Sequence, residues 1–363
     1  MTRSGPLRRG WTTGACAAAA TTAAYEALLT GTFPDPVAIE LPGGKRPQLA
    51  LAVQRIGPGA ATAGIVKDAG DDPDVTHGAL VLATVRAGEP GSGVVFRAGA
   101  GVGTVTLPGL PLAVGEPAIN PAPRAMMRAA VQRVAAAHGR GGGADVVVEI
   151  GVEGGEEIAR RTWNPRLGIV GGLSILGTTG VVIPYSCSAW IASIRSGIDV
   201  ARAVGHEHVV AATGETSERA AQGRYDLPDS ALLDMGDFAG ALLQHLARHP
   251  IARLTLAGGF AKLSKLAAGH LDLHSARSQV DLERLARLAS ECGGSTELAA
   301  SIRAANTALH ALQLATGAGI ALADRVAADA RAVALGALAG APVEVELLVV
   351  DREGHVVGAT GAA

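Results

Sequence analysis

The chain has 363 residues, of which 3% are aromatic and 18% are charged, and its net charge is −2 at pH 7. This balance excludes a generally basic nucleic-acid-binding surface, and so few aromatic residues exclude repeated stacking. Nowhere does the chain reach the roughly 18 uncharged apolar residues that a membrane helix needs. The length predicts two domains, each large enough to bury its own core.

The cysteines form no recognisable metal or disulfide pattern. Cys16, Cys187 and Cys292 are odd in number and far apart, and none belongs to a CxxC pair. This spacing argues against a disulfide framework and against a structural zinc site. We therefore expect a cytoplasmic protein that binds neither membrane nor nucleic acid and holds no metal ion of its own.

Residues 1–162 are predicted to form an α+β domain. Thr12 and Gly31 bracket an alanine-rich segment, the pattern of a capped helix that ends near Leu29. Glycine and proline punctuate the apolar runs that follow, which predicts a sheet or a barrel-like arrangement with tight turns. The expected strands are 37–41, 49–56, 61–66, 80–86, 94–97, 102–107 and 145–150. Helical spacing over 121–138 places Met126 and Met127 in the core.

Residues 163–363 are predicted to form a Rossmann-like α/β domain. Apolar strands alternate with helices here, which indicates a parallel sheet covered on both faces. The expected strands are 208–212, 231–235 and 253–257, and the expected helices are 188–204, 217–222, 238–248 and one that starts at 260. Alanine- and leucine-rich helices fill 278–340, and 343–350 with 356–358 reads as a closing hairpin.

Two polar segments of the first half could carry chemistry. Residues 10–14 stand at a helix start, where free backbone N–H groups bind anions, although a threonine cap explains them better. Residues 67–78 gather four aspartates, a lysine and a histidine. Calcium is disfavoured, because the spacing misses the EF-hand pattern and Pro73 interrupts the ligands. Crowded carboxylates suit acid–base work, and an acidic turn is an equally good interpretation.

Two more segments are rich in glycine. The glycines of 99–103 lead into a strand rather than a helix, so a dinucleotide-binding loop is disfavoured. Asn120 opens a helix whose first turns hold Arg124 and Arg128, and basic residues there favour an anionic partner for Arg124 over a solvated side chain. The glycines within 163–186 predict a backbone that approaches another group closely.

The strand ends of the second half form the last candidate region. Loops 212–217 and 257–262 follow predicted strands, and doubly wound sheets bind ligands at the carboxyl ends of their strands. A Walker loop is excluded by the absence of GK[ST]. The pairs His245/His249 and His270/His274 lack a third metal ligand, and Cys16 is expected to be a buried small side chain.

Taken together, these segments resemble the CbiD family of cobalt-precorrin-5B C1-methyltransferases. The matching strings are 9–24, 67–78, 101–127, 164–186 and 258–275, and the string GLSILGTTG at 172–180 is the most specific. The resemblance implies S-adenosylmethionine as methyl donor and a cobalt-bound, carboxylate-rich tetrapyrrole as acceptor. It implies methylation at C1 of cobalt-precorrin-5B to give cobalt-precorrin-6A in cobalamin biosynthesis.

Roles are assigned from this resemblance together with the residue chemistry. The expected acid–base residues are Asp68, Asp71, Asp72 and His77. The expected substrate-binding residues are Thr12, Thr13, Lys67, Asn120, Arg124, Asn164, Arg166, Lys262 and Lys265. The expected cofactor-binding residues are Gly177, Thr178, Thr179, Thr213, Gly214, Glu215, Gly258 and Gly259, with Glu215 accepting from the ribose hydroxyls.

Two alternatives remain at this point. One is a non-catalytic protein that binds or channels a corrinoid, and the other is a nicotinamide-dependent reductase of the same pathway, which no strand–GxGxxG–helix unit supports. A homo-oligomer and transient contacts with other enzymes of the pathway are compatible with the sequence.

Overall fold

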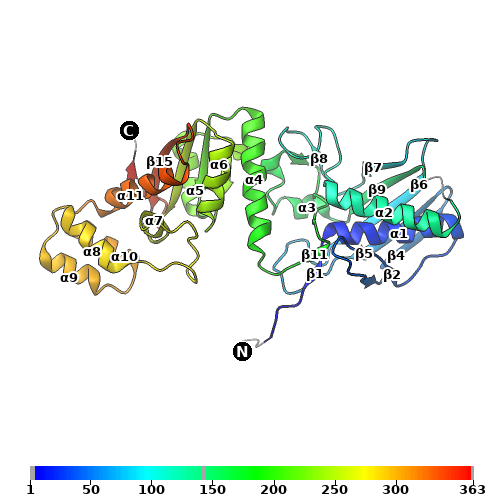
Figure 1. Cartoon of the computed structure of the whole chain (residues 1–363), viewed down its shortest axis with the longest axis horizontal. Helices are drawn as coiled ribbons and strands as arrows, with labels where there is room; N and C mark the ends of the chain where they lie inside the picture. The colour runs from blue at the N-terminus through cyan, green and yellow to red at the C-terminus, as the bar shows by residue number, and fades with distance from the viewer. Residues whose placement is uncertain (1–4, 141–143, 361–363) are drawn as a thin grey trace. The chain divides into compact units, whose positions relative to one another are not determined.

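A computed structural model describes residues 5–140 and 144–360, which fold into two compact units, Met1–Cys187 and Ser188–Ala363 (Figure 1). The boundary lies after the predicted one at 162/163, because the intervening segment adds strands to the first unit. In that segment β10 (Ile169–Val170) pairs with β8 (Thr104–Val105), and β11 (Val181–Val182) pairs with β1 (Gly10–Trp11). Among the described residues no helix is long and apolar enough to cross a bilayer.

The first unit is built on an open five-stranded sheet in the order β4-β5-β6-β9-β7. Its strands are β4 (Val53–Gly57), β5 (Ala60–Val66), β6 (Leu80–Ala87), β7 (Val94–Ala98) and β9 (Val146–Val152). All neighbours are antiparallel except β7 and β9. The short strands β2 (Val37–Ala38) and β3 (Gln48–Leu49) pair separately. The predicted sheet is therefore present, and it ends at β4 and β7 rather than closing as a barrel.

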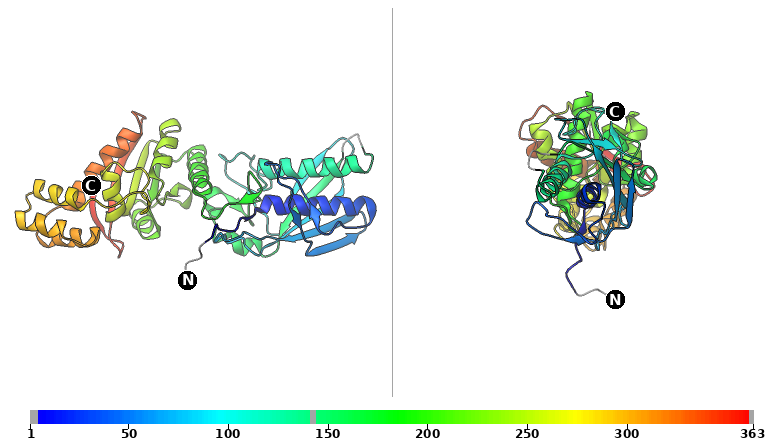
Figure 2. Two further views of the ribbon diagram at one scale, coloured as in Figure 1. Left: turned by 60° about the horizontal axis from the view of Figure 1, so that its bottom comes forward. Right: turned by 90° about the vertical axis from the view of Figure 1, so that its right-hand side faces the viewer.

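Two helices, α1 (Thr13–Thr30) and α2 (Pro121–Ala137), lie side by side against this sheet (Figures 1 and 2). The predicted caps of α1 are confirmed, since Thr12 accepts a hydrogen bond from Ala15 N and Gly31 ends the helix with φ 78°. Its many buried alanines let α1 approach the sheet closely, and Met126 and Met127 of α2 join the same core. The remaining helix of this unit is α3 (Gly155–Ala159).

The second unit contains a five-stranded sheet in the order β13-β12-β14-β15-β16. Its strands are β12 (His208–Ala212), β13 (Leu232–Asp234), β14 (Arg253–Gly259), β15 (Glu344–Val350) and β16 (Val356–Thr360). The first four strands in this order are parallel, and β16 closes an antiparallel hairpin with β15, as predicted. Successive residues of each strand face opposite cores, which is why the strands are mainly apolar.

Helices cover both faces of this sheet. Val210, Ala212 and Leu348 face α5 on one side, whereas the larger core on the other side includes residues of α4, α6, α7 and α11. The helices are α4 (Cys187–Val204), α5 (Glu215–Tyr225), α6 (Ala239–Arg248), α7 (Phe260–Ala267), α8 (Leu282–Glu291), α9 (Thr296–Arg303), α10 (Ala308–Gly317) and α11 (Leu322–Ala337). The loops that leave β12 and β14 lead to α5 and α7 on opposite faces, which leaves a crevice between them.

A cluster of polar side chains links β12, β14 and β15 near the amino-terminal ends of these strands. His208 Nε2 lies 2.8 Å from Thr255 Oγ1, and Arg253 donates to the buried Glu346 at 2.7 Å. Tyr225 packs edge-on against the His208 ring, with centroids 4.8 Å apart. Burial, aided by the nearby Arg253, lowers the pKa of His208. The cluster therefore favours a neutral imidazole and lies away from the carboxyl ends of the strands.

Glycines allow backbone-to-backbone contact in the first unit. A Cβ at Gly172 would lie 2.3 Å from the carbonyl carbon and oxygen of Gly101, and one at Gly177 would lie 2.4 Å from Thr12 Cβ. The sequence predicted a close approach by this glycine-rich segment. The groups it approaches are other parts of the same unit.

We predict that Gly172→Ala destabilises the protein by about 1–3 kcal/mol, because the added methyl has only rigid backbone to displace. The matched control is Gly57→Ala at the end of β4, where a Cβ would meet nothing within 4 Å. Urea unfolding of both variants checks this. Equal stability of the two would contradict the packing.

Candidate functional site

Segments that are distant in sequence meet at the start of α1. Gly14 N donates to Leu176 O at 2.9 Å, and Leu176 N donates to Thr13 Oγ1 at 2.9 Å. Trp11 N donates to Asp68 O at 2.7 Å, and Asn120 N donates to Ile175 O at 3.0 Å. The first unit thus brings together four of the segments that the sequence analysis selected.

Groups of the protein itself form the hydrogen bonds at the start of α1. Thr12 Oγ1 accepts from Ala15 N at 3.1 Å, Thr12 N donates to Gly180 O, and Gly14 N is engaged by Leu176. The threonine-cap interpretation therefore accounts for Thr12, and Thr13 fastens the 172–180 loop. An anion site on these two side chains is not formed. Cys16 is buried beside them, and burial raises its pKa to about 12, as expected of an inert thiol.

Lys67 has an internal role. Its side chain is 2% exposed, and Nζ donates to Asp74 Oδ2 at 2.7 Å. Asp74 Oδ1 accepts from both the N–H and the hydroxyl of Thr76. A buried cation paired in this way fixes the fold of its loop and cannot reach a substrate, which corrects its predicted binding role.

The predicted catalytic aspartates organise neighbouring segments. Asp68 accepts from the Arg8 guanidinium and from Gly70 N, and Asp71 accepts from Arg8 N at 2.7 Å. Asp72 accepts from Tyr185 N at 2.7 Å. The hydrogen bond from Arg8, followed by that from Gly70 N, lowers the pKa of Asp68 to about 2. Asp68 is therefore ionised near neutral pH and suited to neither proton donation nor abstraction.

His77 differs from these carboxylates. Its Nδ1 accepts from Ala69 N at 3.1 Å, which assigns the proton of the neutral ring to Nε2. The side chain is 54% exposed and borders a shallow cavity of about 350 Å³ with Glu153 and Arg161. Within residues 5–140 and 144–360, Nε2 has no hydrogen-bond partner. His77 keeps an N–H available to a ligand.

The two predicted substrate-binding residues near α2 differ in whether the protein itself engages their side chains. Arg124 donates to Glu116, to Ile119 O at 2.7 Å and to Pro117 O at 3.0 Å, so its predicted anionic partner is its own loop. Asn120 begins α2 without a side-chain cap bond, and its amide has no partner in the described part of the chain.

Asn164 precedes a short 3₁₀ turn, Pro165–Leu167, that contains Arg166. The buried Asn164 donates to Gly172 O and accepts from Ser174, so its amide is engaged. Arg166 is half-buried and also interacts within the protein. Among the predicted substrate-binding residues of the first unit, Asn120 is partly exposed and its side-chain amide is not engaged by the described residues.

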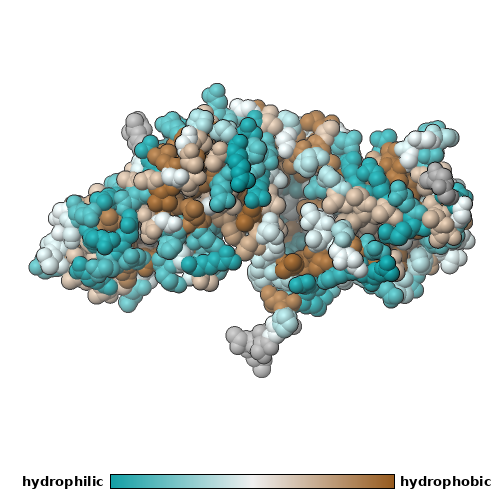
Figure 3. Space-filling view, in the orientation of Figure 1, coloured by the Kyte–Doolittle hydropathy of each residue, from teal (hydrophilic) through white to brown (hydrophobic). Residues whose placement is uncertain are grey.

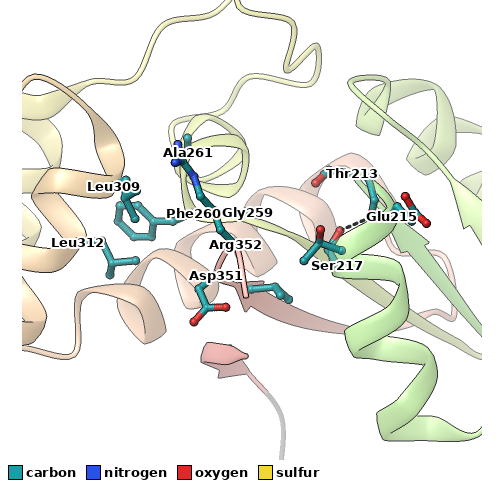
Figure 4. A pocket seen from close by; sticks show the side chains of 13 residues that line it. Thr213, Glu215, Ser217, Gly259, Phe260, Ala261, Leu309, Leu312, Asp351 and Arg352 are labelled. Carbon is teal, nitrogen blue, oxygen red and sulfur yellow. Dashed lines mark hydrogen bonds between the residues drawn. The ribbon is translucent and has the colours of Figure 1, made fainter. Parts of the chain in front are cut away.

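The second unit holds a cavity of about 290 Å³ at the carboxyl ends of β12, β14 and β15 (Figure 4). The residues that line it are Thr213, Gly214, Glu215, Thr216, Ser217, Gly259, Phe260, Ala261, Leu309, Leu312, Val350, Asp351 and Arg352. They come from the first turns of α5 and α7, from α10 and from the β15–β16 turn. One wall is polar and the other is apolar.

Several predicted cofactor-binding residues meet here. Thr213, Gly214, Glu215 and Gly259 line the cavity, and Gly258 lies behind it, where a Cβ would come within 2.9 Å of the Thr213 side chain. Glu215 is 76% exposed and pairs with Arg219 of the next turn. Gly177, Thr178 and Thr179 belong to the first unit and are not among the residues that line this cavity.

The two lysines predicted to bind substrate are both engaged. Lys262 Nζ donates to Thr213 O at 2.9 Å and lies 3.1 Å from Asp237 Oδ1. It therefore braces the loop after β12. Lys265 is buried and donates to Leu273 O at 2.9 Å. Neither ammonium group is placed to grip a substrate carboxylate.

Sequence comparison identifies the family. The CbiD profile matches residues 1–184, and the profile of the CbiD C-terminal domain matches residues 272–361. The chain belongs to the CbiD family. This confirms the resemblance found in the sequence.

Relatives of this CbiD protein align over nearly its whole length. One from Rhodospirillum rubrum is 62% identical over 98% of this chain and 98% of its own. One from Brucella anthropi is 61% identical over 96% of this chain and 95% of its own. Both are named cobalt-precorrin-5B C(1)-methyltransferase. The crystal structure of the cobalamin biosynthesis protein CbiD from Archaeoglobus fulgidus matches with 27% identity and a TM-score of 0.41, covering 76% of this chain and 85% of that one.

Some side chains of this CbiD protein that shape the sites escaped sequence reasoning. Arg352 and Asp351 reach the cavity because they follow β15, and Leu309 reaches it from α10. The position of Asp351 after an apolar strand was a usable signal, since strand ends of a parallel sheet meet at one edge. The others required the packing of distant elements.

The described residues of this CbiD protein form no cluster of three or more histidine, cysteine, aspartate or glutamate side chains suited to a metal ion.

We predict that Asp68→Asn lowers the stability of this CbiD protein at neutral pH. Because the pKa of Asp68 is lowered by folding, its contribution is present above pH about 4 and is lost as the pH falls toward about 2. Urea midpoints of wild type and variant should therefore converge in that range. Glu157→Gln, which removes an exposed surface pair with Arg160, should have little effect at any pH. A constant difference at every pH would contradict the Asp68 ionisation.

Proposed function

We propose that this protein transfers a methyl group from S-adenosylmethionine to C1 of cobalt-precorrin-5B, giving cobalt-precorrin-6A, in the cytoplasmic stage of corrin synthesis. The observation that carries the proposal is the full-length identity of 62% with the Rhodospirillum rubrum relative of that name. The cobalt ion belongs to the substrate. A carrier that binds corrinoid without reacting is the second candidate, and only the reaction separates the two.

The strand-end cavity fits the methyl donor. Its volume of about 290 Å³ is at the lower end of small-molecule pockets, which suits a nucleoside-sized ligand and is too small for a whole tetrapyrrole. The parallel strand order β13-β12-β14-β15, which is 2-1-3-4 in chain order, is compatible with a doubly wound sheet, in which ligands bind where successive loops leave on opposite faces. The loops after β12 and β14 are such a pair, and the cavity lies between them.

The chain's residues would act mainly by holding the methyl donor and the acceptor in position. Bound S-adenosylmethionine supplies an electrophilic methyl group, and holding that group in line with a ring carbon is the main source of rate enhancement open to such a reaction. The loop after β12 and the first turn of α5 provide polar contacts, and Phe260, Leu309 and Leu312 provide the apolar wall. Lys262 and Gly258 keep the polar wall rigid from behind.

We assign the acceptor to the exposed loops of the first unit. Asn120 and His77 keep free N–H groups there, which can bind peripheral carboxylates. Exposed apolar side chains lie on other loops of this unit, namely Leu7, Leu176, Ile183 and Tyr185. The visible face of the molecule shows such apolar areas among hydrophilic ones (Figure 3). A tetrapyrrole, apolar on its faces and acidic at its rim, matches that mixture.

The deciding test is anaerobic incubation of the full chain with cobalt-precorrin-5B and methyl-labelled S-adenosylmethionine. We expect label in the ring. Tight tetrapyrrole binding without transfer would establish the carrier instead. Turnover that requires a nicotinamide and leaves the ring unlabelled would establish the reductase.

A second prediction concerns the donor cavity. Gly259 begins α7, has an ordinary φ of −68° and would direct a Cβ into open space within the cavity lining. Gly259→Val should therefore fill the cavity without strain and weaken S-adenosylhomocysteine binding at least about tenfold. Gly223→Val on α5, where a Cβ also meets nothing within 4 Å, is the matched control. Calorimetric titration measures both, and undiminished binding by Gly259→Val would remove the donor from this cavity.

A further inference from the structure

The five-stranded sheet of the first unit has one face against α1 and α2 and a second face that is partly exposed. Val81, Phe96 and Val148 lie on the first face and are buried in the core that the sheet forms with the helices. The side chains that alternate with them along the strands are half-buried or exposed. We call these alternate side chains the outer face. Strand pairing places Arg55, Leu80, Leu82, Arg86, Arg97 and Glu149 on it.

The centre of the outer face is apolar and low in relief. Gly64 of β5 is paired with Leu82 of β6, and Val66 is paired with Leu80. A Cβ at Gly64 would lie 2.8 Å from Leu82 Cδ2 and 3.0 Å from Leu80 Cδ1, so both leucines lie over the backbone of β5. Val66 beside them is 51% exposed. An exposed apolar area with polar residues at its border is typical of a binding surface.

The edges of the outer face carry positive charge. Strand pairing places Arg55 of β4 and Arg97 of β7 in one row across the sheet. Neither guanidinium has a partner among residues 5–140 and 144–360, whereas Glu149 between them accepts from Arg86 at 3.2 Å. Four strand spacings of about 4.8 Å, or roughly 19 Å, separate the two edge strands. Each edge therefore presents a cation that the described chain does not neutralise.

The outer face continues to the shallow cavity that His77 borders. Leu80, at the start of β6, lines that cavity of about 350 Å³ together with His77. Glu153 and Arg161 border it as well, and their opposite charges leave the balance of the outer face unchanged. The Nε2–H of His77 thus lies beside one end of the apolar centre.

A flat ligand with apolar faces and an acidic rim has the shape and charge that this surface lacks. Its faces would cover the two leucines, and its carboxylates would pair with guanidinium groups at the edges. A second copy of the chain fits less well, because two outer faces placed together would bring unpaired arginines of like charge together. Charge complementarity therefore favours an anionic occupant.

We propose that the outer face binds the tetrapyrrole acceptor, with its ring on Leu80 and Leu82 and its carboxylates toward Arg55 and Arg97. This inference rests on the proposed function, and it adds a surface for the ring to the donors already assigned to the carboxylates. A ring that lies on this face keeps its opposite face free, which methyl transfer to a ring carbon requires.

The first test is an anaerobic absorbance titration of the full chain with cobalt-precorrin-5B. Arg55→Gln combined with Arg97→Gln should weaken binding at least about tenfold, because two charge-assisted contacts are lost. Binding by the double variant should also depend less on salt than binding by wild type. Its affinity for S-adenosylhomocysteine should be unchanged. The matched control is Arg133→Gln combined with Arg287→Gln, which removes two exposed, unpartnered arginines of α2 and α8 and should change neither affinity.

A second variant tests the apolar centre. Leu82→Asp places a carboxylate where the ring would lie, and the partly exposed position lets the chain fold with that charge solvated. It should also weaken binding of cobalt-precorrin-5B at least about tenfold. Val114→Asp, in a loop of the same unit where the native side chain is 58% exposed, is the control and should bind as wild type does.

The other outcomes separate this inference from the proposed function. If wild type binds cobalt-precorrin-5B and both the double arginine variant and Leu82→Asp bind it equally well, the inference is overturned and the proposed function stands. If Leu82→Asp instead converts a dimer to a monomer in sedimentation velocity and leaves acceptor binding unchanged, the outer face is an interface between copies. If wild type does not bind cobalt-precorrin-5B, the proposed function fails and the inference fails with it.

Discussion

Contact between backbones, made possible by glycine, is the constraint on which the first unit depends. At Gly10 a Cβ would lie 2.1 Å from the Ala69 carbonyl carbon, and comparable clashes with backbone occur at Gly70 and Gly172. These contacts bring β1, the 67–78 loop and the 172–180 loop together around the start of α1. The glycine-rich strings that identify the family are therefore first of all packing positions. Ligand binding is left to the side chains that remain exposed around them.

Much of the fold could be predicted because its signals are local. Thr12 and Gly31 cap α1 as expected, since a cap is made within one turn of the helix. The strand β12 and the helix α2 also follow directly from apolar periodicity. The barrel-like alternative and the boundary at 162/163 could not be decided locally. Both depend on which strands pair, and β10 and β11 pair with strands far back in the sequence.

The candidate sites were only partly predictable for the same reason. Sequence order places Thr213 and Gly259 at strand ends, so the cavity they share could be anticipated. Arg352 lies nearly a hundred residues beyond β14 and reaches the cavity only because β15 is the next strand of the sheet. Residue type also misled: Lys67, Arg124 and Lys265 have the charge to bind an anion, yet Asp74, Glu116 and a backbone carbonyl already occupy them.

This internal use of cations narrows how a polyanionic acceptor could be recognised. A near-neutral chain, several of whose least exposed lysines and arginines pair with its own carboxylates, cannot rely on a broad positive field. On the proposed function, recognition depends on individually placed donors, such as the Asn120 amide and the His77 Nε2–H, whose strength depends on direction as well as distance. Directional donors fixed by a rigid backbone discriminate the positions of carboxylates around a ring. Selectivity among similar tetrapyrroles then follows from the same glycine contacts that hold the loops in place.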